Sequence, residues 1–378
     1  MHLRTYLCAA AAALSAACAS DRPRVETEYF GTLSTGDTVT LYRLRCGSGS
    51  MEVTDYGCRI VRICTPDRDG RIDDVVVGYG DIASFEQGSE RFFGALIGRY
   101  GNRIDGAAFP LDGRIVHLTP NETLDGQPVH LHGGTKGFDR VMWSAEPLLG
   151  PDRAGVRFTR VSPDGEEGYP GNLDCSVTYW WTKENTCRIE YEATTDKPTA
   201  VNLSNHTYFN LKGANGGYVL DHVLQVEADR YFRNNTHYVP DGASRPAEGT
   251  PFDMREPRRI DHGIDLPDEQ LRIMHGFSVC WELRSGGGAL AKAADLYEPG
   301  CGRGVETWTT EPGLLTYTGR GLNGKMIGKG GVPLQKFGGM LLETIHFPDS
   351  PNRPELPSAI LRPGERYCSV TEFRFYAK

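Results

Sequence analysis

The chain has 378 residues, a formal net charge of −8 at pH 7, 24% charged residues and 39% hydrophobic residues. This composition is typical of a soluble globular protein, and the mild acidity gives no reason to expect nucleic acid as a partner. The content of 46 Gly, 23 Pro, 15 Phe, 17 Tyr and 5 Trp favours short strands joined by turns over long helices.

Residues 1–19 have the pattern of an export signal. Arg4 precedes an alanine-rich apolar run, residues 7–18, which is too short to span a bilayer as a mature helix. The letters LSAAC, which end at Cys18, resemble a bacterial lipoprotein cleavage box, in which the cysteine would carry a lipid anchor. Cleavage after Ala19 would instead release a soluble periplasmic protein. We therefore expect an exported protein, either periplasmic or anchored to a bacterial membrane through a lipid on Cys18.

The cysteines outside the signal are scattered, without a CxxC pair or a metal-ligand spacing. Export would permit disulfides, but the spacing assigns no pairing, and we predict neither a metal nor another cofactor. These eight residues are Cys46, Cys58, Cys64, Cys175, Cys187, Cys280, Cys301 and Cys368.

After a polar stretch at residues 21–28, which we interpret as a linker, the chain is a succession of short alternating segments separated by turn residues. Residues 187–193, for example, alternate between apolar and charged side chains, as half-buried strands do. Residues 289–297 have helical propensity, yet we expect a strand there. No repeat or flexible linker divides the chain. We predict one all-β domain, a large β-sandwich, over residues 26–377.

The segment VNLSNHTYFNL, residues 201–211, alternates like a strand but carries three asparagines and His206. Each of these polar groups would cost about 1 to 3 kcal/mol if it were buried without a partner, so the segment favours the wall of a polar pocket. Imidazole exchanges protons near neutral pH, which makes His206 a candidate acid or base. The alternative is a buried histidine held by its neighbours.

Other polar residues stand beside glycines or at the end of an apolar run. Asn102 and Arg103 lie in GRYGNRI, and His132 lies in LHGG, in segments that we expect to be binding loops. Glu343 follows the apolar run Gly-Met-Leu-Leu, where burial would raise its pKa. Taken alone, each also fits a plainer interpretation: a surface cation for Arg103, a turn residue for His132 and a solvated strand end for Glu343.

Eight motifs occur in an order that resembles the aldose 1-epimerase (galactose mutarotase) family over nearly all of the chain after the signal. The resemblance implies a galactose mutarotase-like supersandwich with an open sugar cleft. It also implies an isomerase that interconverts the α and β anomers of free hexoses without cofactor or metal, as a monomer or homodimer. The motifs are GRYGNRI, LHGGTKGFD, SPDGEEGYPGNL, NLSNHTYFNL, GTPFD, TTEPG, LLET and LRPGERY.

The resemblance also implies roles for the polar residues noted above. Glu343 matches the catalytic base, which takes the proton of the C1 hydroxyl, and His206 matches the acid, which protonates the ring oxygen. His132 matches a second histidine near the ring oxygen. Asn102 and Arg103 match substrate-binding residues. General acid–base groups of this kind contribute about 10² to 10⁴ in rate each.

Two positions depart from the family pattern. Ser278, in GFSVCW, stands where the family has an aspartate that holds sugar hydroxyls, and Glu311, in TTEPG, stands where the family often has a substrate-binding glutamine. We therefore expect an altered sugar preference or weaker affinity for galactose and glucose, with His275 or Asp265 as possible local substitutes for the aspartate.

Three other functions compete with this interpretation. A carbohydrate-binding homologue without turnover is favoured by Ser278 and opposed by the presence of both His206 and Glu343. A glycoside hydrolase would use Glu343 and Glu311 as a carboxylate pair. An enzyme for a phosphorylated sugar would need a basic cluster or a glycine-rich phosphate cradle, and the sequence offers only Arg103.

Overall fold

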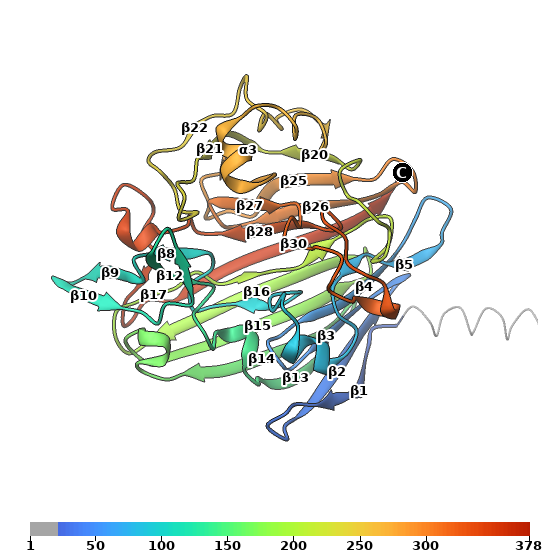
Figure 1. Ribbon diagram of the computed structural model, residues 1–378. Coiled ribbons are helices and arrows are strands. Elements are labelled where there is room, and N and C mark those ends of the chain that lie inside the picture. Colours follow the sequence, from blue (N-terminus) through green and yellow to red (C-terminus); the bar gives the residue numbers. More distant parts are fainter. Residues whose placement is uncertain (1–21) are drawn as a thin grey trace, which may run out of the picture.

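The computed structural model describes residues 22–378, which form a β-sandwich built on two large sheets (Figure 1). The strands of both sheets pair antiparallel with their neighbours. The larger sheet has nine strands in the order β13 (Ser144–Leu149), β14 (Arg153–Ser162), β15 (Leu173–Thr182), β16 (Thr186–Thr195), β30 (Tyr367–Ala377), β26 (Arg303–Thr309), β25 (Ala291–Tyr297), β20 (Val223–Val226), β23 (Arg258–Arg259).

The second large sheet has seven strands, and its central members come from the last third of the chain. Their order is β22 (Arg245–Pro246), β21 (Ala228–Phe232), β24 (Ser278–Leu283), β27 (Gly313–Tyr317), β28 (Met340–Ile345), β19 (Tyr208–Phe209), β6 (Val76–Val77).

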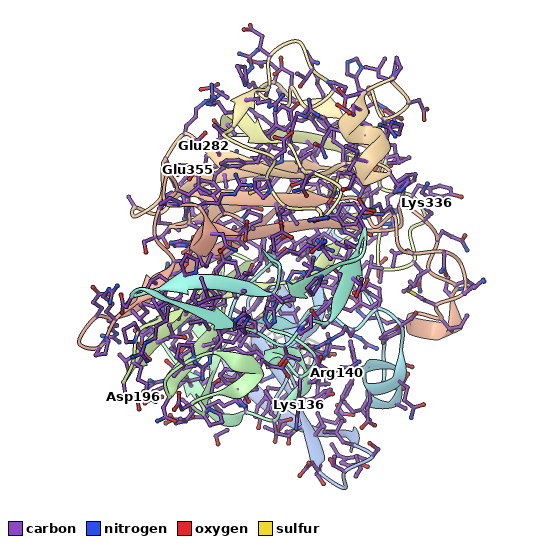
Figure 2. The ribbon with its side chains drawn as sticks, turned by 60° about the vertical axis from the view of Figure 1, so that its left-hand side comes forward. Lys136, Arg140, Asp196, Glu282, Lys336 and Glu355 are labelled. Atoms are coloured by element: carbon purple, nitrogen blue, oxygen red, sulfur yellow. The ribbon has the colours of Figure 1, made fainter. Side chains whose placement is uncertain are left out.

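The main hydrophobic core lies between these two sheets. Phe209 of β19 packs against Phe373 and Phe375 of β30, with ring centroids 5.0 and 5.9 Å apart. Trp281 of β24 is fully buried in the same cluster. Many charged side chains lie at the surface; Figure 2 labels several, of which Lys136, Asp196, Lys336 and Glu355 are exposed.

A five-stranded sheet extends the sandwich at its N-terminal side, where β2 packs on β14. It consists of β1 (Arg24–Thr32), β2 (Thr38–Cys46), β3 (Gly49–Thr54), β4 (Ile60–Pro66) and β5 (Ile72–Asp74). The small sheets are β9 (Ala108–Leu111) with β10 (Arg114–His117), β8 (Arg103–Asp105) with β11 (Glu122–Leu124) and β12 (Gln127–Leu131), β7 (Leu96–Ile97) with β18 (Ser204–Asn205), and β17 (Thr199–Ala200) with β29 (Ile360–Leu361).

Helices are few and short, and each closes a loop. The α-helices are α2 (Ile82–Gln87) and α3 (Glu269–Met274), and the 3₁₀ turns are η1 (Phe138–Arg140), η2 (Glu166–Gly168), η3 (Lys329–Gly331) and η4 (Ser350–Asn352). No helix within residues 22–378 is both long enough and apolar enough to cross a bilayer. None of the eight cysteines in this range forms a disulfide bond.

The predicted fold class is confirmed: the chain is an all-β sandwich, and the segment with helical propensity forms β25. The predicted linker is wrong in part, because β1 begins at Arg24. Its side chains pair with the next strand, as in the contacts of Glu26 with Arg43 and Arg45 at 3.7 and 3.4 Å. The predicted export signal, residues 1–19, lies outside the described residues.

Candidate active site

A cavity of about 370 Å³ opens on the face of the seven-stranded sheet that points away from the main core. Its volume lies within the range of small-molecule sites. Strands β19, β24, β27 and β28 supply part of its wall, and the loops around β8 and β12 supply the rest. Five predicted site residues line it: Asn102, Arg103, His132, His206 and Ser278.

Strand alternation explains why β28 carries a charged residue without disturbing the core. Successive side chains of a strand point to opposite faces. Met340 and Leu342 therefore belong to the main core, whereas Leu341 lines the cavity. Glu343 shares the outward parity of Leu341 and pairs in register with Leu315, another lining residue. Its carboxylate consequently lies on the cavity side of the sheet.

Glu343 is a fully buried carboxylate, and within residues 22–378 neither of its oxygens has a hydrogen-bond partner. The Ser204 hydroxyl, which lies close by, donates to the Thr344 carbonyl instead, at 2.8 Å. Burial raises the pKa of Glu343 to about 8, and Ser204 and the positive charge of Arg103 offset only part of this shift. An empty site therefore holds Glu343 largely protonated at neutral pH.

Hydrogen bonds of its backbone hold His206 in place. Its N–H donates to the Ala95 carbonyl at 2.9 Å, and its own carbonyl accepts from Gly94 N–H at 3.0 Å. The ring Nδ1 is buried without a hydrogen-bond partner among the described residues. Burial lowers the pKa of His206 to about 3, so its imidazole is neutral in the empty site.

Two hydrogen bonds join His132 and Asn102. The Asn102 N–H donates to Nδ1 of His132 at 3.1 Å, and the His132 N–H donates to the Asn102 carbonyl at 3.0 Å. This contact leaves the second ring nitrogen, Nε2, to carry the proton of the neutral tautomer. Burial, followed by the neighbouring His206, lowers the pKa of His132 well below its usual value. Both Asn102 and His132 have left-handed backbone, with φ of 61° and 49°.

The glycines of the LHGG motif allow this loop to approach its neighbours closely. A Cβ at Gly133 would stand 1.7 Å from the Gly98 carbonyl oxygen, and one at Gly134 would stand 2.3 Å from the carboxylate of Glu167. That carboxylate accepts hydrogen bonds from the backbone N–H groups of residues 135 and 136. Two motifs that are about 30 residues apart in sequence thus form one support beneath His132.

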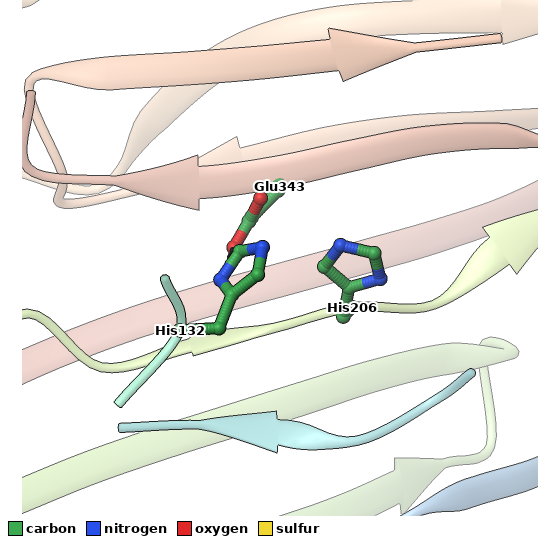
Figure 3. Close-up of side chains that lie close together, drawn as sticks. All are labelled: His132, His206 and Glu343. Carbon is green, nitrogen blue, oxygen red and sulfur yellow. Dashed lines mark ion pairs between the residues drawn. The ribbon is translucent and has the colours of Figure 1, made fainter. Parts of the chain in front are cut away.

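The two imidazoles and the Glu343 carboxylate converge (Figure 3). Nδ1 of His132 lies 4.0 Å from Oε1 of Glu343, and the two histidine rings lie 5.0 Å apart, edge to face. One donor atom from each of the three residues falls within 4.8 Å of the others, a set that also suits a metal ion. Asn102 already occupies the Nδ1 lone pair of His132, which leaves that residue only Nε2 for a metal.

Arg103 lines the cavity and forms an ion pair with Glu122. Its guanidinium donates to both oxygens of Glu122, at 2.8 and 3.1 Å, and lies 5.2 Å from the ring centroid of Tyr238. A bidentate pair of this kind fixes the orientation of the side chain. The Arg103 side chain therefore has a fixed orientation toward a ligand in the cavity.

Ser278 begins β24 and lines the cavity, at the position predicted for a sugar contact. The suggested local substitutes for the missing aspartate do not join it. His275 and Asp265 line a separate depression beside α3. Helix α3 ends at Met274, and His275, which caps it, has left-handed backbone. The substitution at Ser278 is thus not compensated by these two neighbours.

Glu311 does not line the cavity, in contrast to the substrate contact predicted for it. Its carboxylate accepts hydrogen bonds from His346 and Tyr367. Burial alone would raise the pKa of Glu311, but these partners outweigh it and hold the pKa below its ordinary value. The ion pair with His346 explains why a carboxylate is stable where the resemblance suggests an amide.

Several lining residues escaped the sequence analysis because no motif marks them. They lie in loops whose spatial neighbours are distant in sequence, and only their charge or aromaticity was available as a signal. They include Glu90, Arg91, Phe92, Glu122, Tyr317 and Arg320.

The fold and the cavity define a sugar-sized site on a β-sandwich, with a buried carboxylate and two neutral imidazoles able to exchange protons. A model of the aldose 1-epimerase family matches residues 40–374. Among curated proteins, the chain is 40% identical to galactose mutarotase of Mus musculus, covering 92% of this chain and 97% of the relative. It is 35% identical to aldose 1-epimerase of Escherichia coli K12, over 91% and 97% of the two chains.

Solved structures agree with the sequence relatives. A crystal structure of galactose 1-epimerase from Lactobacillus acidophilus superimposes with a TM-score of 0.81 at 25% identity, covering 94% of this chain and 99% of the other. The chain belongs to the aldose 1-epimerase family.

Proposed function

We propose that this chain is an isomerase that interconverts the α and β anomers of a free hexose, with galactose and glucose as reference substrates. The observation that carries the proposal is the unpartnered Glu343 carboxylate, which lies beside His132 and His206 at the cavity. The names of the relatives, galactose mutarotase and aldose 1-epimerase, support the same reaction.

Opening a cyclic hemiacetal needs two proton transfers. Glu343 takes the proton of the C1 hydroxyl while His206 protonates the ring oxygen as the C1–O5 bond breaks. Rotation about C1–C2 presents the other face of the aldehyde, and the reverse transfers close the ring. No proton is gained or lost over the cycle, so the pair returns to its starting state.

The protonation states of the empty site set the starting point for this reaction. Burial favours neutral Glu343 and neutral His206, so the pair shares a single proton that resides on the carboxyl group. A sugar brings a C1 hydroxyl that can donate to the carboxylate, and Arg103 adds positive charge nearby. The effect of Arg103 is already part of the pKa of about 8, so the added hydrogen bond from the sugar is what favours the charged carboxylate and leaves the shared proton for His206.

The roles that we assign to the remaining residues follow from their contacts. His132 carries its proton on Nε2 and can donate to a sugar oxygen near the reacting centre. Arg103, oriented by Glu122, and Asn102 line the same wall and are proposed to hold sugar hydroxyls.

Polarimetry of freshly dissolved α-galactose and α-glucose tests the proposal. We expect the protein to accelerate mutarotation and Glu343→Gln to lower the enzymatic rate by about 10² or more. The matched control is Glu355→Gln, because Glu355 is an exposed carboxylate outside the cavity, and it should retain the rate. Loss of rate in both variants, or in neither, would contradict the proposed base.

A carbohydrate-binding protein without turnover is the second candidate, and Ser278 in the cavity favours it. It predicts saturable binding of a hexose by calorimetry with no acceleration of mutarotation by the unmodified protein. We further propose that the chain is exported, on the basis of residues 1–19.

A further inference from the structure

Arg320 is a cation in the cavity wall that forms no ion pair with any residue of 22–378. It follows the end of β27, and its side chain lines the cavity. Its Nε atom is buried, and no hydrogen bond of the guanidinium is found within the part of the chain that the structure describes. The terminal nitrogens, which are not buried in this way, remain available to donate to a ligand in the cavity.

The other two arginines of the cavity are neutralised by carboxylates. Arg91 donates to both oxygens of Asp139, at 2.8 and 2.6 Å, and Arg103 is paired with Glu122. Arg320 shares an aromatic neighbour with Arg103, because both guanidinium groups lie 5.2 Å from the ring centroid of Tyr238. Among the described residues, Arg320 is therefore the one arginine of the cavity wall that has no carboxylate partner.

Glu90 is the remaining lining carboxylate, and it does not supply the missing charge. It forms no ion pair with Arg320 among residues 22–378, and one of its oxygens accepts from the Phe92 N–H at 3.2 Å. Burial also raises the pKa of Glu90 to about 7, so the group is only partly ionised at neutral pH. The rings of Tyr317 and Tyr238 contact the Arg320 guanidinium but do not neutralise its charge.

Strand register places Arg320 at the end of the cavity remote from Glu343. Tyr317 pairs with Leu341, which precedes Glu343 by two residues, or about 7 Å along β28. The chain then continues past Tyr317 in the same direction, as the hydrogen bond from Thr318 N–H to the Phe277 carbonyl indicates. Arg320 therefore faces the part of a sugar farthest from C1.

The same end of the sheet holds Ser278, which pairs in register with Tyr317. The family resemblance places an aspartate there. The exchange for serine removes a negative charge one strand away from Arg320, and that charge would repel an anionic ligand. The loss of the carboxylate and the unpaired arginine thus both make the electrostatic potential of this wall more positive.

We propose that Arg320 selects a hexuronate, a free hexose oxidised to a carboxylate at C6, as the substrate of this chain. The proposal rests on the proposed mutarotase function. A free C1 hydroxyl is required for ring opening, which excludes a 1-phosphate and leaves the remote end of the sugar for the charge. A planar guanidinium binds a carboxylate through two parallel hydrogen bonds, which the two terminal nitrogens of Arg320, Nη1 and Nη2, can donate.

The test compares mutarotation of galacturonate, glucuronate, galactose and glucose at pH 7 by polarimetry or by NMR of the anomeric protons. We expect kcat/KM to be at least tenfold higher for one of the uronates than for its neutral counterpart. Arg320→Gln should lower that ratio by about tenfold to a hundredfold, and Arg320→Lys should restore part of it. Ser278→Asp should lower the ratio as well. The control is Arg114→Gln, since Arg114 is exposed on β10.

The outcomes separate this proposal from the one on which it rests. Acceleration of galactose or glucose with no preference for either uronate overturns the role of Arg320 and leaves the mutarotase function intact. Acceleration of no sugar overturns the mutarotase function itself. A preference for galactose 6-phosphate over galacturonate overturns the carboxylate in favour of a phosphate. An unchanged ratio in Arg320→Gln, with an unchanged melting temperature, also overturns the proposal.

Discussion

Glu343, the proposed base, illustrates how a buried carboxylate can be kept reactive at the expense of folding stability. Its two oxygens are buried without partners in the described chain. Ser204 turns its hydroxyl to a backbone carbonyl instead. Both oxygens of the carboxylate therefore remain able to accept hydrogen bonds from a ligand. Buried groups that are unsatisfied in this way are concentrated at functional sites.

The first prediction concerns stability as a function of pH. The pKa of Glu343 is raised in the folded state from 4.5 to about 8, so folding favours the protonated form. Its contribution is fully present below pH 4.5 and is lost as the pH rises toward 8, by about 3 kcal/mol at pH 7. Glu343→Gln does not titrate and should gain relative stability between pH 5 and pH 8, as measured by urea unfolding. A stability difference independent of pH would contradict this expectation.

The second prediction concerns the pH profile of the reaction. If Glu343 and His206 act as a pair with one shared proton, kcat/KM is constant between their pKa values, about 3 and about 8. Above pH 8 it should fall tenfold per pH unit, because the last proton leaves the pair. The measurement is the enzymatic mutarotation rate corrected for the spontaneous rate at each pH. A steady rise from pH 6 to pH 9 would mean that the doubly deprotonated site is the active one.

At the scale of elements, alternation along a strand accounts for what the sequence predicted well. The polar segment around His206, which forms β18 and β19 on either side of that residue, and the apolar run before Glu343 both signal residues that face a pocket while their neighbours face the core. Loop partners were not predictable in this way. The pairing of Glu122 with Arg103 bridges 19 positions, and Arg320 stands in a turn without a motif. Such contacts depend on how the loops fold over the sheet.

Glu311 shows a different limit. The resemblance gives its place in the chain, but the effect of replacing an amide by a carboxylate depends on which groups lie nearby. Here the added charge is taken up by His346, whose pKa is raised because the attraction of Glu311 outweighs burial. The residue is therefore part of an internal ion pair rather than of the cavity wall.

The third prediction tests the support beneath His132. Gly133→Ala should destabilise the fold by about 3 kcal/mol or more and abolish activity, because its Cβ would overlap the Gly98 carbonyl at a left-handed φ of +84°. Gly113→Ala is the matched control: φ is +78° there, but nothing lies within 4 Å of the added Cβ. It should cost only about 1 to 2 kcal/mol by denaturant unfolding and spare catalysis. Equal losses of stability in both variants would mean that backbone strain, and not the overlap with Gly98, destabilises Gly133→Ala.

At the scale of the whole molecule, the fourth prediction concerns residues 1–19, which lie outside the described residues. If Cys18 carries a lipid, full-length protein expressed in a bacterium should incorporate labelled fatty acid and sediment with membranes. Cys18→Ser should abolish the label. A soluble periplasmic protein of the same mature length in both cases would favour conventional cleavage after Ala19, and an uncleaved cytosolic protein would contradict export.

The alternation of the seven-stranded sheet also bears on how such proteins diverge. Ser278, Leu341 and Glu343 face the cavity, while their immediate neighbours Val279 and Leu342 belong to the core. The contacts with a ligand and the packing of the interior thus depend on different residues of the same strand. A replacement on the cavity face can therefore change what the cavity holds while the residues of the core stay as they are.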